Sequence, residues 1–409
     1  MKSLNQSGVP QEKILEELSE KLNKDLTYES GKILGSMCTI PHDLARKLMT
    51  MYLEKNLGDP GLFKGTQEIE IETIKMLGSL LNNPKSWGYI VSGGTEGNIV
   101  AMRIARNIGR TKIRGGTPEI IIPTSAHASF DKAADLLGIR LVRVNLDQEY
   151  RVKPSEVKKA ITDKTIAIVG IAGTTSLGTI DPIEELSEIA LEKNLYLHID
   201  AAFGGMVIPF LERLGYKLPK FDFRNQGVSS ITIDPHKMGL APIPAGGILF
   251  KDRTYILENC FEIPYLAGGT YAHPIILGTR SGAAVIATWA TLKHLGIEGY
   301  TRIVKNCMEV THQLEKGIQQ IKNVELATKP VMNIVGITSK KLDICQIDQE
   351  LRKLHWALGK FENFLRIVVM PHVKPQHIQQ FLTDLEQIIK KNQIKNKTTT
   401  PPKINNKTK

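Results

Sequence analysis

This chain of 409 residues has few cysteines, no long apolar run and no internal repeat that we recognise. Its four cysteines, at positions 38, 260, 307 and 345, form no CxxC pair, which excludes a disulfide framework and argues against a zinc site. The longest apolar run, residues 166–172, is far too short to cross a bilayer, and residues 1–23 mix charges throughout. We therefore expect a cytoplasmic protein with reduced thiols, no metal and no membrane partner.

Acidic side chains are outnumbered, with 42 Asp and Glu against 53 Lys and Arg, which gives a net charge of +11. The excess is uneven, because residues 391–409 hold six lysines and no acid and so leave only +5 for the rest of the chain. This segment is typical of a disordered, Lys-rich tail. A basic nucleic-acid-binding protein is an alternative from a different functional class, but it rests on this charge alone, and we expect no nucleic-acid partner.

Between residues 87 and 252, short β-rich runs alternate with amphipathic helical segments such as 99–108 and 183–193. Near-continuous apolar strands separated by helices predict a doubly wound, mostly parallel α/β domain with helices on both faces of the sheet. In such sheets ligands bind at the carboxyl ends of the strands. The seven predicted strands cover residues 89–91, 119–122, 141–144, 166–169, 195–199, 230–233 and 247–250.

The same patterns predict four parts along the chain. Residues 1–66 form an N-terminal segment of helices and loops, and residues 67–290 form the large α/β domain. Residues 291–390 form a small α+β domain. A long helical stretch from 281 to 321 leads into it, and strands near 331–338 and 364–370 and a last helical stretch at 376–390 follow. Residues 391–409 are the tail.

Small and polar residues follow the first two strands. Glycines and a hydroxyl open a helix at Gly94 and Thr95, where first-turn N–H groups and the helix dipole favour an anion such as phosphate. A plain capped helix with a tight turn is the alternative. His127 follows the second strand, at a place where a flat imidazole can stack on an aromatic ligand or serve a structural purpose.

Further candidate site residues lie at or after the ends of three later strands. Thr175 offers a hydroxyl after the fourth strand, to a ligand edge or to a helix cap. Asp200 ends an otherwise apolar strand, where a carboxylate needs a cationic or hydrogen-bonding partner, and the small Ala202 leaves room for a flat group beside it. Lys237 follows a strand, a proline and His236; lysine forms imines with carbonyl compounds, and we expect burial to lower its pKa.

One sheet edge is thus expected to hold a phosphate cradle, a stacking histidine, a carboxylate and an amine. Pyridoxal 5'-phosphate requires these four groups, because its phosphate, its ring faces, its pyridine nitrogen and its aldehyde each need a partner. The alternatives of a surface lysine and an acid paired with an arginine do not explain why all four follow strands of one sheet.

Four motifs resemble the group II pyridoxal-phosphate-dependent decarboxylases, closest to archaeal L-tyrosine/L-aspartate decarboxylases, and the resemblance extends over residues 26–390. They are Gly-Ser-Met-Cys-Thr at 35–39, Asn-Leu-Gly-Asp-Pro-Gly-Leu-Phe at 56–63, Asp-Pro-His-Lys-Met-Gly at 234–239 and Leu-Arg-Ile-Val-Val-Met-Pro-His-Val at 365–373. The resemblance implies a fold-type I transferase fold and a homodimer with a shared active site.

The resemblance also implies roles for individual residues. Lys237 binds the cofactor covalently, Asp200 pairs with the pyridine nitrogen, and His127 stacks on the ring. The phosphate lies near residues 94, 95 and 236, and the ring edge lies near Thr175. Tyr271, on the Gly-rich loop 267–274, returns a proton to the substrate's Cα. Arg366 resembles the arginine that binds the substrate carboxylate. By its chemistry, an aromatic substrate needs apolar walls such as Leu62 and Phe63, whereas aspartate needs a further cation or donor such as His273.

The implied reaction is amino-acid decarboxylation, of L-tyrosine to tyramine for methanofuran, of L-aspartate to β-alanine for coenzyme A, or of both. A lyase of the sphingosine-phosphate type, which cleaves Cα–Cβ, is an alternative that needs a second phosphate site, and the sequence offers none that we recognise. A cysteine desulfurase would need a reactive thiol, for which Cys260 is the candidate, but its apolar neighbours predict a buried one.

Overall fold

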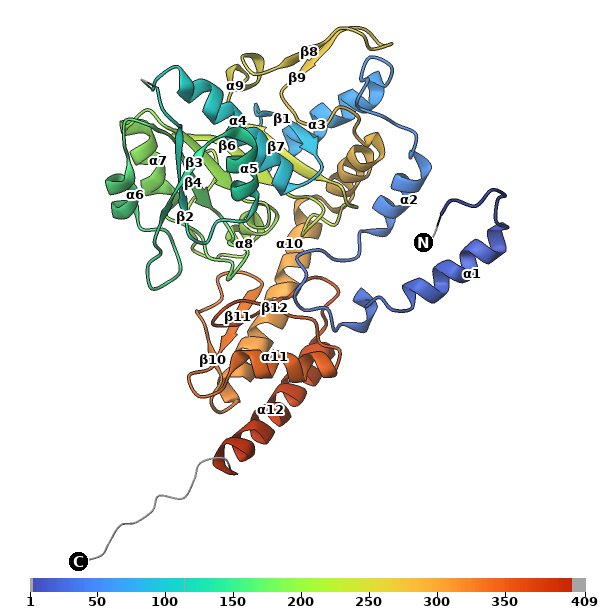
Figure 1. The fold of residues 1–409 in the computed structure, drawn as a ribbon, viewed down its shortest axis with the longest axis vertical. Helices are drawn as coiled ribbons and strands as arrows, with labels where there is room; N and C mark the ends of the chain where they lie inside the picture. Colours follow the sequence, from blue (N-terminus) through green and yellow to red (C-terminus); the bar gives the residue numbers. More distant parts are fainter. Residues whose placement is uncertain (1–2, 114, 399–409) are drawn as a thin grey trace, which may run out of the picture.

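A seven-stranded sheet forms the centre of the protein in the computed structural model, which describes residues 3–113 and 115–398 (Figure 1). All seven predicted strands are present. The sheet order is β1-β7-β6-β5-β4-β2-β3, and only β7 runs antiparallel to its neighbours. The predicted doubly wound, mostly parallel α/β fold is therefore confirmed. The strands are β1 (Trp87–Val91), β2 (Glu119–Pro123), β3 (Arg140–Val144), β4 (Thr165–Ile171), β5 (Tyr196–Asp200), β6 (Val228–Ile233) and β7 (Gly246–Phe250).

Helices cover both faces of this sheet, as the two-sided apolar strands require. Ile120 and Ile122 pack with α4 (Gly94–Arg110) and α5 (Ser129–Leu137) on one face. Ile121 points to the other face and belongs to a cluster with residues of five helices. Those helices are α3 (Lys64–Leu80), α6 (Pro154–Ala160), α7 (Ile183–Glu192), α8 (Ile208–Arg213) and α10 (Gly282–Gln320).

A smaller antiparallel sheet forms a second core. Its order is β10-β11-β13-β12, with α11 (Ile344–Lys353) and α12 (Pro375–Thr398) packed beside it around Trp356 and Phe381. Helix α10 joins the two cores, because Val285 lies in the large one and Leu314 in the small one (Figure 1). The strands are β10 (Glu325–Leu326), β11 (Ile334–Thr338), β12 (Gly359–Lys360) and β13 (Leu365–Val368).

The predicted boundaries between the parts of the chain do not coincide with the ends of helices. The boundary after residue 66 falls inside α3, and the one after residue 290 falls inside α10, whose helical backbone is interrupted at Gly296 (φ 55°, ψ −170°). Helix α12 continues to Thr398, so the expected tail at 391–409 begins as helix; residues 399–409 lie outside the described residues. Helix α10 extends past residue 290 because its apolar face contributes to both cores.

The N-terminal region and one hairpin lie at the periphery (Figure 1). Helix α1 (Gln11–Leu22) buries no side chain, whereas α2 (Asp43–Met51) packs on α10. The hairpin of β8 (Phe261–Ile263) and β9 (Tyr271–His273) follows the short α9 (Thr254–Leu257). None of the helices within the described ranges is long and apolar enough to cross a membrane.

Two glycines bring α4 unusually close to the sheet. A Cβ at Gly97 would lie 3.0 Å from the Thr232 side chain on β6, and one at Gly109 would lie 2.4 Å from the Ile166 side chain on β4. Such distances are shorter than ordinary van der Waals contacts, so only glycine allows this approach. The approach sets the position of the first turn of α4, at the carboxyl ends of the strands.

We predict that Gly109→Ala destabilises the protein by about 1–3 kcal/mol, because the added methyl group overpacks the α4–β4 contact. Gly65→Ala is the matched control: Gly65 is also helical, but its Cβ would meet nothing within 4 Å. The control should be neutral or more stable by up to about 1 kcal/mol from helix propensity. Thermal and urea unfolding of both variants measure the difference, and equal stabilities would contradict the close approach.

Candidate active site

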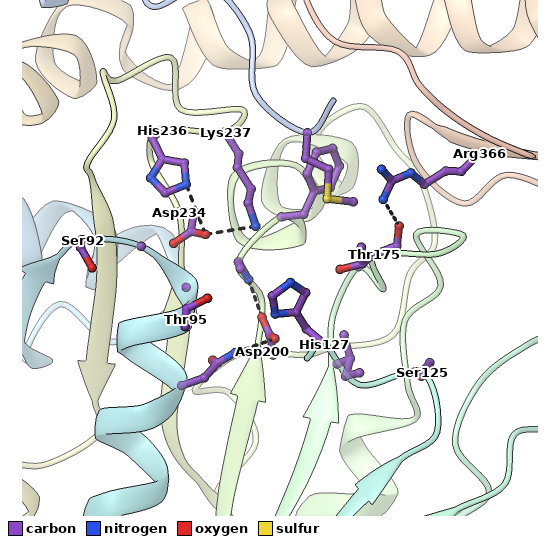
Figure 2. A pocket seen from close by; sticks show the side chains of 18 residues that line it. Ser92, Thr95, Ser125, His127, Thr175, Asp200, Asp234, His236, Lys237 and Arg366 are labelled. Carbon is purple, nitrogen blue, oxygen red and sulfur yellow. Dashed lines mark hydrogen bonds and ion pairs between the residues drawn. The ribbon is translucent and has the colours of Figure 1, made fainter. Parts of the chain in front are cut away.

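A cavity of about 430 Å³ opens at the carboxyl ends of the central strands (Figure 2). Its walls come from segments far apart in sequence, because parallel strands bring their C-terminal residues to one edge. Nine of the predicted site residues line it together. They are Gly94, Thr95, His127, Thr175, Asp200, Ala202, His236, Lys237 and Arg366.

The start of α4 forms one wall of the cavity. Helix α4 begins at Gly94, and a Cβ there would lie 2.9 Å from Asp234 Oδ2 and 3.1 Å from Ala202 Cβ. Glu96 Oε2 accepts a hydrogen bond from the Ser92 N–H at 2.8 Å, which ties the strand end to the helix. The first-turn N–H groups of α4 have no intrahelical acceptor and lie beside the cavity. This wall is a cradle for an anion.

Lys237 is held by a turn that its own motif forms. The Lys237 N–H donates to the Asp234 carbonyl at 3.0 Å, and Lys237 Nζ lies 3.1 Å from Asp234 Oδ2. His236 Nε2 lies 3.6 Å from the same carboxylate oxygen. The turn places an amine, an imidazole and a carboxylate at the end of β6 within reach of one another.

The prediction that the pKa of Lys237 is lowered is wrong. Burial by itself lowers the pKa of Lys237, but the negative charges of Asp234 and Asp200 outweigh burial and raise the pKa above its ordinary value. Burial lowers the pKa of His236, so this imidazole is neutral near pH 7. The sequence reasoning considered burial and cations and did not weigh Asp234, which lies three residues before the lysine.

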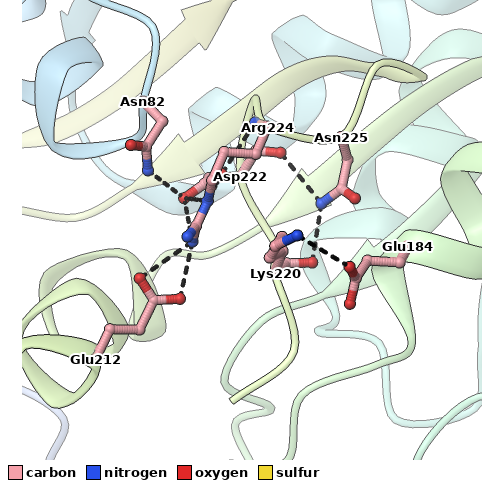
Figure 3. A network of polar contacts seen from close by, with 7 residues as sticks. All are labelled: Asn82, Glu184, Glu212, Lys220, Asp222, Arg224 and Asn225. Atoms are coloured by element: carbon pink, nitrogen blue, oxygen red, sulfur yellow. Dashed lines mark hydrogen bonds and ion pairs between the residues drawn. The ribbon is translucent and has the colours of Figure 1, made fainter. Parts of the chain in front are cut away.

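The opposite end of β6 is fixed by a polar network (Figure 3). Arg224 Nε donates to Asp222 Oδ1 at 2.8 Å, and its Nη2 donates to Glu212 Oε1 at 2.8 Å. Asp222 Oδ2 also accepts from Asn82 Nδ2 at 2.8 Å. The network links the segment before β6 to the residues after α3 and to α8, so the strand that leads to Lys237 is anchored at its far end.

Asp200 lies deep in the cavity, and two neutral donors bind its carboxylate. The Ala202 N–H donates to Oδ1 at 3.1 Å, and Asn98 Nδ2 donates to Oδ2 at 2.9 Å. His127 Nδ1 accepts from the Ser129 N–H at 3.1 Å, which fixes the ring in the cavity (Figure 2). A carboxylate whose described donors are neutral keeps lone pairs available to a cationic ligand group.

Arg366 enters the cavity from β13 of the small sheet. Its Nη1 donates to the Thr175 carbonyl and its Nη2 to the Gly35 carbonyl, each at 2.6 Å. Its buried Nε has no partner among the described residues, and burial lowers the pKa of this guanidinium. The described acceptors are both uncharged carbonyls, so Arg366 presents a cation to the cavity that can bind an anion.

Three predicted residues do not line this cavity in their own chain. Tyr271 and His273 lie on β9 with their ring centroids 5.5 Å apart, and the buried Arg280–Glu70 ion pair lies close to both. Phe63 lies beside Lys55, whose Nζ is 5.7 Å from the centre of the ring. Their assignment to a site shared between two subunits stays a prediction.

Other residues at the cavity were missed. Asn98 and Asp234 contact the two central groups, and Met37, Ser125 and Phe203 add to the walls. Asn98 lies one turn after Thr95 on the helix, so a polar side chain buried at that spacing was a usable signal. Asp234 is the first residue of the Asp-Pro-His-Lys-Met-Gly motif at 234–239. Cys260 is absent from the cavity walls and burial raises its pKa, which argues against the desulfurase alternative.

The chemistry of this cavity fits pyridoxal phosphate. A glycine cradle that a Cβ would fill suits the phosphate, and a buried carboxylate with free lone pairs suits a protonated ring nitrogen. Asp234 Oδ1 and Ser125 Oγ are buried without a described partner, so polar atoms remain for a ligand. An amine for the aldehyde and an imidazole for the ring face complete the set.

Comparisons with known proteins agree with this fit. The chain matches the model of the pyridoxal-dependent decarboxylase conserved domain over residues 47–340. It is 50% identical over 384 residues to the L-aspartate decarboxylase of Thermococcus kodakarensis, covering 94% of this chain and 98% of that protein. It is 51% identical to a probable L-tyrosine/L-aspartate decarboxylase of Methanothermobacter thermautotrophicus, covering 89% and 99%.

Among solved structures, a sphingosine-1-phosphate lyase of Burkholderia pseudomallei superposes with a TM-score of 0.89 at 30% identity, covering 98% of each chain. This likeness confirms the predicted fold-type I architecture. The family model matches well over half of the chain and the two archaeal relatives are about 50% identical to it, so the chain belongs to the pyridoxal-dependent decarboxylases, lyases that use pyridoxal phosphate to decarboxylate amino acids.

Proposed function

We propose that this protein removes the α-carboxyl group of L-aspartate and releases β-alanine. The observation that carries the proposal is the buried guanidinium of Arg366 at the cavity, whose described hydrogen bonds go to the carbonyls of Thr175 and Gly35. A buried cation is costly without an anion, and an acidic amino acid supplies a carboxylate beyond the one that leaves. The names of both archaeal relatives include L-aspartate.

L-Tyrosine is the second candidate substrate. The cavity also has apolar walls at Met37, Ile171 and Phe203, which suit an aromatic side chain, and the name of one relative includes L-tyrosine. Decarboxylation of tyrosine would give tyramine for methanofuran, whereas β-alanine from aspartate would serve coenzyme A.

The proposed roles of the residues follow from their positions. Bound pyridoxal phosphate supplies a pyridinium ring that accepts the electron pair left when carbon dioxide departs. Lys237 holds the cofactor covalently, Asp200 keeps the ring nitrogen protonated, and His127 stacks on the ring. The phosphate lies at Gly94, Thr95 and His236, the hydroxyl of Thr175 faces the ring edge, and the small Ala202 leaves space beside Asp200.

We further propose a homodimer whose sites are completed across the interface. Tyr271, as the group that returns a proton to Cα, and Phe63 and His273, as substrate contacts, lie outside the cavity of their own chain. Tyr271 and His273 lie in the β8–β9 hairpin, and Phe63 lies in the loop 56–63. Both segments expose large apolar side chains, Tyr265 at 84% in the hairpin and Leu62 at 59% in the loop. Such side chains are typical of protein interfaces.

The substrate proposal is tested by incubating the purified protein with pyridoxal phosphate and L-aspartate, L-tyrosine or L-glutamate in turn. We expect release of carbon dioxide and β-alanine from L-aspartate at the highest kcat/KM. If kcat/KM is higher for L-tyrosine, L-tyrosine is the preferred substrate and the proposal for L-aspartate is wrong. If none of the three is decarboxylated, the proposed function is wrong.

The role of Lys237 is tested by Lys237→Ala, which should abolish the visible absorbance of the covalently bound cofactor and all turnover. The control is Lys251→Ala: that lysine follows the neighbouring strand β7, and its Nζ donates to Gln226 outside the cavity. The control should keep both properties. Persistence of the absorbance in Lys237→Ala would show that another lysine holds the cofactor.

Asp234 should slow attachment of the cofactor at neutral pH, because its charge raises the pKa of Lys237 and only the neutral amine reacts. In Asp234→Asn that pKa falls, so a larger fraction of the amine is neutral at any pH below it. We expect the apoprotein of this variant to regain visible absorbance severalfold faster than wild type near pH 7, with the difference shrinking as pH rises. Asp252→Asn, in the exposed loop after β7, is the control. Equal rates at all pH values would contradict the ion pair.

A further inference from the structure

Buried polar side chains lead away from Asp200 into the core between the sheet and α4. Tyr196, His198 and Asp200 alternate along β5 and therefore lie on one face of the strand. The intervening Leu197 and Ile199 belong to the apolar cluster on the other face. His198 is 0% exposed and Tyr196 and Asp200 are each 6% exposed, so this is a polar row inside the protein. Such a row is costly unless every group is satisfied.

The row is connected to the carboxylate through α4. Asn98 Nδ2 donates to Asp200 Oδ2 and to Ser129 Oγ, each at 2.9 Å. The carbonyl oxygen of the same amide, Oδ1, lies 3.0 Å from His198 Nε2. Asn98 is 1% exposed and uses both its amino and its carbonyl group. It is therefore locked between the acid and the histidine.

The far end of the row lies on β6. His198 Nδ1 lies 2.8 Å from Ser230 Oγ, and that oxygen accepts from the Tyr196 hydroxyl at 2.7 Å. Ser230 pairs with His198 in the β5–β6 register and is completely buried. Thr232 Oγ1 is a more distant neighbour of His198 Nε2, at 3.4 Å.

One proton arrangement satisfies these contacts. A carboxylate only accepts, so the amino group of Asn98 must face Asp200 and its carbonyl must face His198. His198 Nε2 then carries a proton. Burial lowers the pKa of His198 to about 4, so the ring is neutral near pH 7 and its Nδ1 accepts from the Ser230 hydroxyl. Every donor in the row thus points towards Asp200.

We propose that Asn98 and His198 are positioning residues, and that the donor row from Tyr196 through Ser230 holds the Asp200 carboxylate so that it is aimed at the cofactor's ring nitrogen. This inference rests on the role of Asp200 in the proposed function. Hydrogen bonds to an ionised acceptor favour the charged form, and neighbouring hydrogen bonds polarise one another in a buried row. The row explains why one face of β5 is polar while the other is apolar.

The experiment measures two quantities for each purified variant: the dissociation constant of pyridoxal phosphate from the apoprotein, by absorbance titration, and kcat and KM for the preferred substrate. In Asn98→Leu, we expect the dissociation constant to rise and kcat to fall by about tenfold, the loss for one hydrogen bond to a charged group. His198→Leu removes a hydrogen bond to the neutral amide of Asn98, so we expect the same two changes at about fivefold. KM should stay within about twofold, since the row lies behind the cofactor site rather than beside Arg366.

Two further variants separate positioning from stability. In His198→Gln, the amide nitrogen can take the place of Nε2 and donate to Asn98, so most of the cofactor affinity should return. Ser187→Ala removes the acceptor of the Gly227 N–H, a 2.8 Å bond of a buried serine on α7 that does not line the cavity. It should lower the melting temperature and leave the dissociation constant unchanged.

Asp200→Asn distinguishes the two hypotheses. If Asp200→Asn keeps wild-type cofactor affinity and turnover, the proposed role of Asp200 fails, and the donor row has no function to support. If Asp200→Asn loses both while Asn98→Leu and His198→Leu behave like Ser187→Ala, the proposed function stands and the positioning role is wrong.

Discussion

Two carboxylates held beside one amine at the edge of a sheet are the constraint on which this structure depends. Asp200 and Asp234 are 6% and 1% exposed, and burying such charges is unfavourable unless each is paired or hydrogen-bonded. The two solutions differ. Asp234 has a cation, Lys237, at 3.1 Å, whereas Asp200 has the amide of Asn98 and a backbone N–H. The two acids therefore differ in their partners, a cation for Asp234 and neutral donors for Asp200.

The layers of the fold follow from keeping those charges in place. Helix α4 must lie close to the strands for Asn98 to reach Asp200, and glycines at 97 and 109 permit that distance. The face of the sheet away from α4 carries the largely apolar cluster that includes α7 and α8, so the polar groups are confined to one side of β5. A polar core layer backed by an apolar one keeps the site rigid, because interiors are packed too densely for the acid to shift.

Much of the fold could be predicted because strands buried on both faces are continuous apolar runs. Residues 166–169 and 230–233 are examples that needed no tertiary information. Where the prediction failed, the cause was a long-range contact. The pKa direction of Lys237 depends on Asp234 folding back through a turn, and Asn98 meets an acid 102 residues away. The predicted boundary after residue 290 falls within α10, which contributes to two cores, and local periodicity does not indicate which core a helix face contacts.

The residues that line the cavity come from two kinds of segment. The groups assigned to the cofactor lie at ends of strands of the central sheet, whose geometry the fold fixes. Arg366 comes from a different sheet, and Met37 comes from the N-terminal segment. Relatives named for aspartate and for tyrosine and aspartate are 50% and 51% identical to this chain, so overall identity does not separate the two substrates. Under the proposed function, substrate preference therefore depends on segments outside the central sheet, and we expect changes there to leave the donors and acceptors at the sheet edge unaltered.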